Sequence, residues 1–438
     1  MAVPSWLTVC STLMARKSSL SPENQDSPAS SSTSGSSSDN PSSTETSLNS
    51  ETSLQSIGSL DSLPSVASLQ LHSTPQENLS PINFRLISSV ELNSGAIQAL
   101  HLAGKCLYTG TSGNQIQALD KHNLALVSTL GNPNPCGKHH GAVKSLAIDG
   151  DSLFIAFQDS KIRVFSLTSP KQKQITSLPT IKDCLIRFIW PQNYVQIRRH
   201  RKRLWISHAD AVSAIAINPG FLYSVSWDKT LKIWRLSDYK CLESLKAHDD
   251  AINAVTVSKE GFIYTGSADK RIKVWTKRNG AKRHELVATL ERHKSAINAL
   301  ALSSDGSVLY SGSGDRSILV WEREDSAQYM SVAGALRGHK RAILSLVVGS
   351  LDLTVGSVMV FSGSADRTVR VWRRGVDGRH ICLAVLDGHH GPVRALVAGF
   401  QGGLDHGLGS WFVYSGCGRG EVRVWEVSGS NSEETELL

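Results

Sequence analysis

The sequence lacks most of the features that carry enzyme chemistry or membrane insertion. It has no apolar run of about 18 residues, the length that a transmembrane helix needs. The phosphate-binding pattern G-x-x-x-x-G-K-[ST], the hydrolase pattern G-x-S-x-G and the zinc pattern H-E-x-x-H are all absent. We therefore expect no membrane association, no bound cofactor and no enzyme activity.

Cysteine is also sparse. The seven cysteines stand singly, and none belongs to a C-x-x-C pair. This spacing argues against a zinc ribbon or a disulfide framework and favours a reducing compartment. Two adjacent histidine pairs, His139-His140 and His389-His390, lack the helical spacing of metal ligands. The sequence therefore predicts no metal site.

A repeated motif dominates the second half of the chain. The segments SVSWDKTLKIW, TGSADKRIKVW, SGSGDRSILVW, SGSADRTVRVW and SGCGRGEVRVW end at Trp234, Trp275, Trp321, Trp372 and Trp425. They recur at intervals of roughly 40 to 50 residues, which is typical of one supersecondary unit used several times. Because one such unit cannot bury its own apolar faces, neighbouring units must stack.

The unit that begins at His248 shows what each repeat contains. It has three β-rich runs, at 251–257, 262–267 and 271–275, separated by Gly and Asp turns. A fourth run, at 285–290, precedes the next unit. Runs that are apolar on both faces favour strands packed between two other sheets. Four such strands per unit predict the blade of a β-propeller.

Each strong unit holds a His, then a Ser/Thr–x–Asp turn and a Trp six residues after the Asp, a pattern that resembles the WD-repeat. The resemblance implies that His, a hydroxyl group, Asp and Trp form a buried hydrogen-bonded chain. The matching residues are His208, Asp228 and Trp234; His248, Asp269 and Trp275; His293, Asp315 and Trp321; and His339, Asp366 and Trp372. None of these tryptophans is followed by the Asp of the family's name.

Three further units are weaker. The places of His, Asp and Trp hold Asn93, Gly113 and Leu119 in the first, His139, Asp159 and Phe165 in the second, and His389, Arg419 and Trp425 in the last. Seven units predict an all-β, seven-bladed WD-repeat β-propeller over residues 84–430, which we expect to be monomeric. The last unit stops after its third strand, so we expect the strand-like run 84–92 to complete it and close the ring.

Residues 1–83 differ in composition from the propeller. They are dominated by Ser, Thr, Asn and Pro, so we expect a disordered tail. Two basic and seven acidic residues give this tail a net charge of −5, and because the whole chain carries +8, residues 84–438 carry +13. Four sites before a proline suit phosphorylation: Ser21, Ser27, Thr74 and Ser80. A short acidic tail, 431–438, follows the propeller.

Two alternatives concern the N-terminal tail. The acid-poor, Ser-rich residues 1–20 are typical either of a disordered cytosolic terminus or of an organelle transit peptide. Apolar residues recur every three positions from Leu54 to Leu69, each after a Ser. This period fits neither a strand nor a long helix, and it indicates either low-complexity sequence or a segment that docks along a groove.

Basic residues mark one face of the predicted ring. The residue after the turn Asp is basic in four successive units, and further basic residues follow the unit's His: Lys229, Lys270, Arg316 and Arg367, then Lys294, Lys340 and Arg341. Because Asp210, Asp249 and Asp250 also follow a His, we expect a face that is basic over the fifth and sixth blades and mixed over the third and fourth. Such a face favours acidic or phosphorylated partners. The alternative is ordinary solvated turn chemistry.

A second basic run lies in an insertion between the second and third units, at 168–207. It consists of Arg198, Arg199, Arg201, Lys202 and Arg203 around one His. Such a run is typical of a nuclear-import signal or a polyanion-binding patch. The apolar residues that flank it are equally consistent with an exposed outer strand.

Longer stretches resemble the plant JINGUBANG-like WD-repeat proteins: NYVQIRRHRKRLWISHADAVSAIAIN, CLESLKAHDDAINAV and GALRGHKRAILSL. The resemblance implies a non-enzymatic protein-interaction scaffold of the plant cytoplasm and nucleus, with a transcription-factor partner and a role in restraining pollen germination. One alternative is a substrate receptor of a cullin-type ubiquitin ligase, although no unit carries the Trp-Asp-x-Arg associated with that role. The other is a nucleic-acid-binding propeller.

Overall fold

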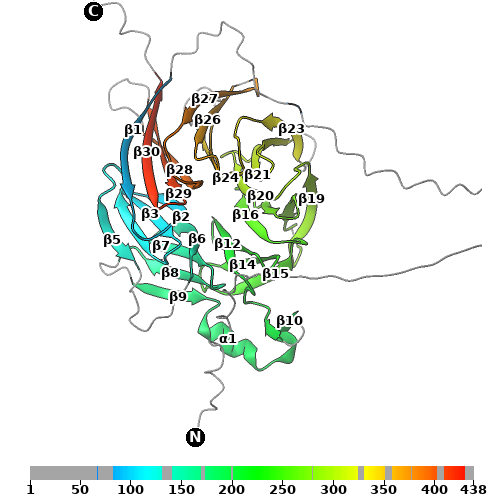
Figure 1. Cartoon of the computed structure of the whole chain (residues 1–438). Coiled ribbons are helices and arrows are strands. Elements are labelled where there is room, and N and C mark those ends of the chain that lie inside the picture. The colour runs from blue at the N-terminus through cyan, green and yellow to red at the C-terminus, as the bar shows by residue number, and fades with distance from the viewer. Residues whose placement is uncertain are drawn as a thin grey trace, which may run out of the picture. The chain divides into compact units, whose positions relative to one another are not determined.

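The fold is that of a ring of seven blades around a central axis (Figure 1). A computed structural model describes residue 67 and residues 82–429, except 131–140, 169–172, 199–200, 279, 324–329, 351–357, 376 and 402–408. Seven antiparallel sheets of four strands each form the blades, so the predicted all-β, seven-bladed propeller is confirmed. No helix among the described residues is long and apolar enough to cross a membrane.

The strands of each blade follow one another from the axis outward. Blade 1 is β2 (Ile97–Ala103), β3 (Cys106–Thr111), β4 (Ile116–Asp120) and β5 (Leu126–Leu130), and blade 2 is β6 (Val143–Asp149), β7 (Ser152–Phe157), β8 (Ile162–Ser166) and β9 (Gln174–Leu178). Blade 3 is β12 (Val212–Asn218), β13 (Phe221–Ser226), β14 (Thr230–Arg235) and β15 (Cys241–Lys246), and blade 4 is β16 (Ile252–Val257), β17 (Ile263–Ser267), β18 (Arg271–Thr276) and β19 (Glu285–Glu291).

The remaining blades repeat this order, except for the last strand. Blade 5 is β20 (Ile297–Leu302), β21 (Val308–Ser313), β22 (Ile318–Arg323) and β23 (Met330–Leu336), and blade 6 is β24 (Ile343–Ser350), β25 (Val358–Ser364), β26 (Val369–Arg374) and β27 (His380–Leu386). Blade 7 is β28 (Val393–Gln401), β29 (Ser410–Cys417), β30 (Glu421–Gly429) and β1 (Ile82–Glu91).

The core lies between neighbouring blades rather than inside any one of them. Every residue of β17 and β21 is buried, which fits strands that are covered on both faces. The cluster between blades 5 and 6 joins Tyr310 and Ile318 of one blade to Leu346 and Trp372 of the next. Each blade therefore depends on its neighbours to bury its apolar surface. This burial stabilises the fold by about 25 cal/mol per Å² of apolar surface removed from water.

A close approach recurs where one blade meets the next. In five blades a glycine of the second strand faces the Ile or Val that begins the next first strand: Gly110 and Val143, Gly266 and Ile297, Gly312 and Ile343, Gly363 and Val393, and Gly416 and Ile97. A Cβ atom at Gly266 would lie only 2.7 Å from the Cγ2 atom of Ile297. The missing side chain lets the two sheets pack in contact.

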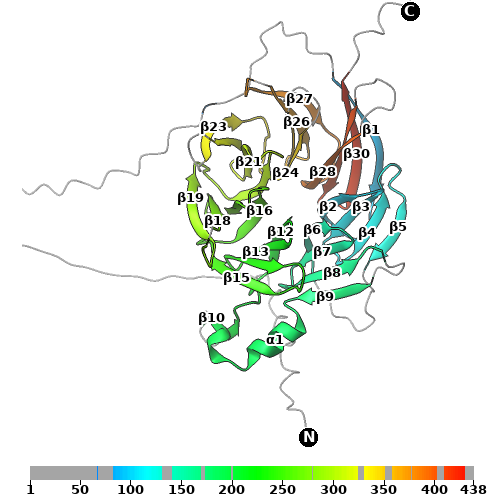
Figure 2. The same ribbon diagram turned by 180° about the vertical axis from the view of Figure 1, so that it is seen from behind.

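The first and last segments of the propeller lie side by side in blade 7 (Figures 1 and 2). β1 pairs with β30 in an antiparallel register that runs from Ile82 opposite Gly429 to Glu91 opposite Glu421. The Arg85 Nε atom lies 2.9 Å from an oxygen of Glu426 across this pair. The fourth strand of blade 7 thus comes from residues before blade 1.

Two features lie outside the blades. The insertion after β9 forms α1 (Ile181–Phe188), a short 3-10 turn (Pro191–Asn193) and a hairpin of β10 (Tyr194–Arg198) and β11 (Arg201–Leu204). In the N-terminal tail, Ala67 accepts a hydrogen bond of 2.9 Å from the Ala335 amide of β23. Ala67 belongs to the segment of three-residue periodicity, whose other residues lie outside the described part of the chain.

A buried hydrogen-bonded chain ties each of blades 3 to 6 together. In blade 3 the indole of Trp234 donates to the Ser224 hydroxyl over 2.8 Å, and the Nε2 atom of His208 lies 2.8 Å from the same hydroxyl. The Nδ1 atom of His208 lies 3.1 Å from Asp228. Thr265, Ser311 and Ser362 supply the same hydroxyl in blades 4, 5 and 6.

The position of this hydroxyl corrects the sequence pattern. The Ser–x–Asp motif points to Ser226, but the Ser226 hydroxyl accepts a bond from the Asp228 amide and so shapes the turn. The linking hydroxyl belongs to Ser224, two residues earlier. Both lie on one side of β13, because alternate residues of a strand share a face.

The protonation states of His208 and Asp228 in this hydrogen-bonded chain follow from burial and from the bonds they form. Burial lowers the pKa of His208 and favours the neutral ring, although Asp228 acts in the opposite direction. Burial by itself would raise the pKa of Asp228, but His208, Thr230 and the Ala209 amide together hold it well below its usual range. A neutral His208 that donates from Nδ1 and accepts at Nε2 satisfies every partner along the chain.

We predict that removing β1 opens the ring. Deletion of residues 84–92 should abolish the sharp thermal transition, because β30 would be left as an unpaired edge and blade 7 would lose its outer strand. Differential scanning calorimetry would measure this. A deletion of residues 1–60, which leaves β1 in place, is the control and should melt like the full chain. Equal melting of both variants would mean that β1 does not close the ring.

We also predict that the carboxylates of the buried hydrogen-bonded chains stabilise their blades. Asp366→Ala should lower the free energy of unfolding by about 1–3 kcal/mol, because the His339 ring and the Lys340 amide lose their acceptor. Urea unfolding followed by tryptophan fluorescence would measure the difference. Asp377→Ala is the matched control in the same blade, since that carboxylate is exposed, and it should change stability by less than about 0.5 kcal/mol.

Candidate binding face

The turn between the second and third strands has the same backbone conformation in every blade. Its central residue has a positive φ, between 68° and 89°, in all seven: Asn114, Ser160, Lys229, Lys270, Arg316, Arg367 and Gly420. Only glycine adopts this left-handed conformation without strain, and Asn tolerates it better than other residues. Lys or Arg nevertheless occupies it in four successive blades. The basic side chains therefore stand at a position that costs backbone energy.

The loops that carry the buried His lie beside these turns. In blade 5 the Lys294 amide donates to Asp315 over 3.0 Å, and in blade 6 the Lys340 amide donates to Asp366 over 2.8 Å. The same carboxylates receive the amides of the turn residues two positions later. One carboxylate per blade thus fixes both the loop and the turn.

Six basic side chains are exposed on this face over blades 4 to 6. We call it the turn face and define it by Lys270, Lys294, Arg316, Lys340, Arg341 and Arg367. Within the described part of the chain, none of these six side chains forms an ion pair. Their charge is therefore available to a ligand, and it raises the local concentration of acidic groups.

Over blades 3 and 4 the charges on this side are partly neutralised. The Lys229 ammonium is half-buried and donates to the backbone carbonyl of Asp249 over 2.5 Å. Arg271 lies 3.6 Å from the Asp249 carboxylate and 2.7 Å from Glu291. Lys229 is thus held between two blades, while Lys270 of blade 4 remains exposed.

Two further basic residues, which the sequence did not indicate, lie nearer the axis. Lys144 and Arg394 occupy the bulge at the start of the first strand in blades 2 and 7. In blades 4 and 5 the same position holds Asn253 and Asn298, whose amides bond to a carbonyl of the next blade. Only the comparison of bulges between blades identifies this position, because no motif marks it.

Lys144 brings this inner charge close to the turns. Its ammonium lies 4.9 Å from the ring centroid of Trp227, the residue that precedes the blade 3 turn Asp, and this ring is 38% exposed. Burial, and then the positive charge of Arg394, lowers the pKa of Lys144. An exposed indole beside the Lys144 ammonium suits a ligand with both an acidic and an apolar part.

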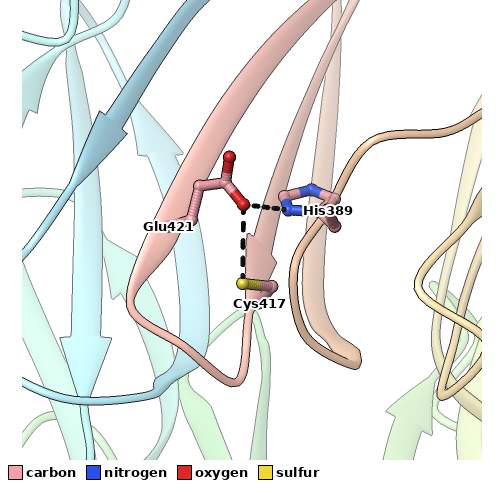
Figure 3. A group of neighbouring side chains, drawn as sticks. All are labelled: His389, Cys417 and Glu421. Atoms are coloured by element: carbon pink, nitrogen blue, oxygen red, sulfur yellow. Dashed lines mark hydrogen bonds and ion pairs between the residues drawn. The ribbon is translucent and has the colours of Figure 1, made fainter.

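Blade 7 keeps the buried chain with a different acid (Figure 3). The sequence places Arg419 where the Asp belongs, but Glu421 takes over the role, with an oxygen 3.2 Å from His389 Nδ1. The rest of the chain is unchanged: His389 Nε2 lies 2.7 Å from Ser415, and Trp425 donates to Ser415 over 2.9 Å. The longer Glu side chain reaches the His from two residues further along.

Two of these residues, together with Cys417, are the one group of possible metal ligands found among the described residues. His389, Cys417 and Glu421 are all buried, and their ligand atoms lie within 4.8 Å of one another. The Arg423 guanidinium lies 2.5 Å from the second oxygen of Glu421, a positive charge that opposes a cation there. Burial lowers the pKa of His389 to about 4. The hydrogen-bonded chain accounts for this group.

Blades 1 and 2 differ from the others, as their sequences indicate. In blade 1, Leu119 is buried in the place of Trp. In blade 2, Asp159 pairs with Arg163 over 2.5 Å, Phe165 is buried in the place of Trp, and His139 lies outside the described residues.

The remaining predicted sites fall in the insertion and the tail. Arg198, Arg201, Lys202 and Arg203 belong to the hairpin of β10 and β11, whereas Arg199 lies outside the described residues. This hairpin is no outer strand of a blade, because β9 fills that place in blade 2. Lys202 is exposed, and Arg203 bonds to the His208 carbonyl. Ser21, Ser27, Thr74 and Ser80 also lie outside the described residues.

Comparison with known proteins agrees with this geometry. The family model described as WD domain, G-beta repeat matches residues 200–235, 239–276, 284–322 and 330–373. These four matches correspond to blades 3 to 6, the blades whose hydrogen-bonded chain uses Asp. Blades 1, 2 and 7 depart from the pattern at the positions described above.

A curated relative shares one short stretch. The probable cytosolic iron-sulfur protein assembly protein 1 of Chaetomium globosum is 39% identical over 71 residues, which are 16% of this chain. The match spans 16% of that protein's own length. Sequence identity over so small a part of each protein reflects the shared repeat and not the protein as a whole. The chain is thus a seven-bladed β-propeller in which blades 3 to 6 match the WD40 repeat.

Proposed function

We propose that this protein is a non-catalytic scaffold that binds acidic or phosphorylated segments of other proteins on its turn face. WD40 propellers generally bind other proteins, and the buried His, Asp and Trp side chains serve to hold the blades. The observation that carries the proposal is the exposed Lys or Arg at the left-handed turn position of blades 4, 5 and 6, namely Lys270, Arg316 and Arg367. A glycine there would cost less, so the side chain itself must contribute something.

The geometry of the turn face suits a phosphorylated ligand. Arg316 and Arg367 present planar guanidinium groups that can bind two oxygens of a phosphate or carboxylate at once. Lys294 and Lys340 add charges from the neighbouring loops, whose backbones are fixed by the same carboxylates. The acidic N-terminal tail, with its four proline-directed sites, has the same chemistry as such a ligand.

The wider biological role rests on the resemblance to the plant JINGUBANG-like proteins. It supports a place in plant developmental or transcriptional regulation, such as restraint of pollen germination, with a transcription factor as one partner. It also supports a location in the cytoplasm and nucleus, and the basic run at 198–203 suits nuclear import.

We predict that reversing the charge of the turn face removes its partners. A variant with Lys270→Glu, Arg316→Glu, Lys340→Glu and Arg367→Glu should lose about tenfold or more of the proximity labelling of specific neighbours in plant cells, because the face would then repel acidic segments. Quantitative mass spectrometry of the labelled proteins would measure the loss, and the melting temperature would show that the variant is folded.

A second variant provides the matched control. Lys105, Lys259, Lys282 and Arg283 are exposed in turns at the opposite ends of the strands, so their change to Glu alters the net charge equally. This control should keep the labelled neighbours. Equal loss in both variants would point to net charge alone, and unchanged labelling in both would place the partner site on another surface.

A further inference from the structure

Helix α1 has its polar side turned inward and its apolar side turned to solvent. Asp183 is 4% exposed and pairs with Arg187 over 2.9 Å, and the Arg187 guanidinium lies 4.8 Å from the ring centroid of Trp205. Thr180 caps the helix by accepting the Asp183 amide over 3.1 Å. An ordinary surface helix buries its apolar stripe, so the arrangement in α1 is the reverse of the usual one.

The apolar side continues through the turn into β10. Large apolar side chains between a third and four-fifths exposed cover it: Ile181, Leu185, Ile186, Phe188, Ile189, Trp190, Val195 and Ile197. We call this set the α1 patch. Both views show α1 and β10 outside the ring, beyond β9 and β15 (Figures 1 and 2). A group of large exposed apolar side chains in one short segment marks a place where another molecule binds.

A cavity opens beside the patch. It has a volume of about 310 Å³, and its apolar lining comes from Pro179, Ile181, Cys184, Leu185, Phe188 and Leu204. Lys161 and Arg203 also line it. A hollow of this size can hold a large side chain, and it lies within the surface that the exposed residues cover.

The insertion that carries the patch is strongly basic in sequence. Residues 168–207 contain nine Lys and Arg but a single acid, Asp183, which is buried against Arg187. Lys182 and Lys202 are exposed. A partner that covers this surface must therefore bring negative charge, or the basic groups would be left against an uncharged or repelling surface.

We propose that the α1 patch is a docking surface for an acidic segment of a partner protein, which inserts a large apolar side chain into the cavity. This binding mode is that of an amphipathic segment in a groove. A second copy of this chain would bring basic residues against basic residues. A flat bilayer would leave the cavity unfilled. The site is separate from the turn face, so it does not depend on the function proposed for that face.

Selection of peptides on the full-length chain tests the proposal. A random-peptide display library would be panned against the wild type and against a variant with Leu185→Asp and Ile186→Asp. The wild type should enrich peptides that combine Asp or Glu with Leu, Phe or Trp, and the variant should bind the enriched peptides at least about tenfold more weakly in fluorescence anisotropy.

A matched control separates the patch from apolar exposure in general. Leu126→Asp and Val127→Asp change two residues of β5 that are each 58% exposed, close to the 64% of Leu185 and 57% of Ile186, and this variant should bind like the wild type. Circular dichroism melting would confirm that both variants fold.

Several results would overturn the proposal. These are enriched peptides without acidic residues, equal binding by the Leu185→Asp, Ile186→Asp variant, or no enrichment at all. Vesicles of phosphatidylcholine and phosphatidylserine that sediment the wild type but not the variant would assign the patch to a membrane. A wild-type dimer that becomes a monomer in the variant would assign it to a second copy.

Discussion

The fold depends on one packing constraint, that each blade must be covered on both faces by its neighbours. A four-stranded sheet with apolar residues on both sides is stable only between two others, so an open row of blades would leave its two end faces in water. The contact of Ile97 with Gly416 joins the first blade to the last. The pairing of β1 with β30 adds a strand from the start of the propeller to a sheet from its end. Both contacts have a long sequence separation, so the chain must close a large loop before they form.

The same constraint gives the turn face its rigidity. Because each blade is fixed by its neighbours, the partly buried carboxylate in its turn can hold both the His ring and the amide after it. In blade 5, Asp315 therefore determines where Lys294 and Arg316 stand relative to one another. The acid that stabilises the blade also positions the charges at its surface, so the turn face is built from the residues that repeat.

The repeated part of this structure could be predicted from the sequence. Residues that do their work from a position other than the one the repeat assigns could not. The spacing of His, Asp and Trp led to seven blades, which the structure confirms. Glu421 was missed because its longer side chain reaches His389 from a position that the motif does not assign. Ser224 was missed because the Ser–x–Asp pattern points to Ser226, on the same face of the strand. The orientation of α1 has no signal in the sequence, since its apolar spacing is also that of a buried helix.

The turn face and the α1 patch differ in what they can recognise. The turn face offers charge at fixed backbone positions, and charge alone attracts many acidic ligands without separating them well. The α1 patch combines charge with a cavity that rejects a side chain of the wrong size, and such a combination can discriminate between acidic partners. The first surface comes from the repeat and the second from an insertion into it. The insertion alone carries nine basic residues against one acid, so it can attract an acidic partner as the turn face does. A scaffold with two such separate surfaces is able to hold two partners at once.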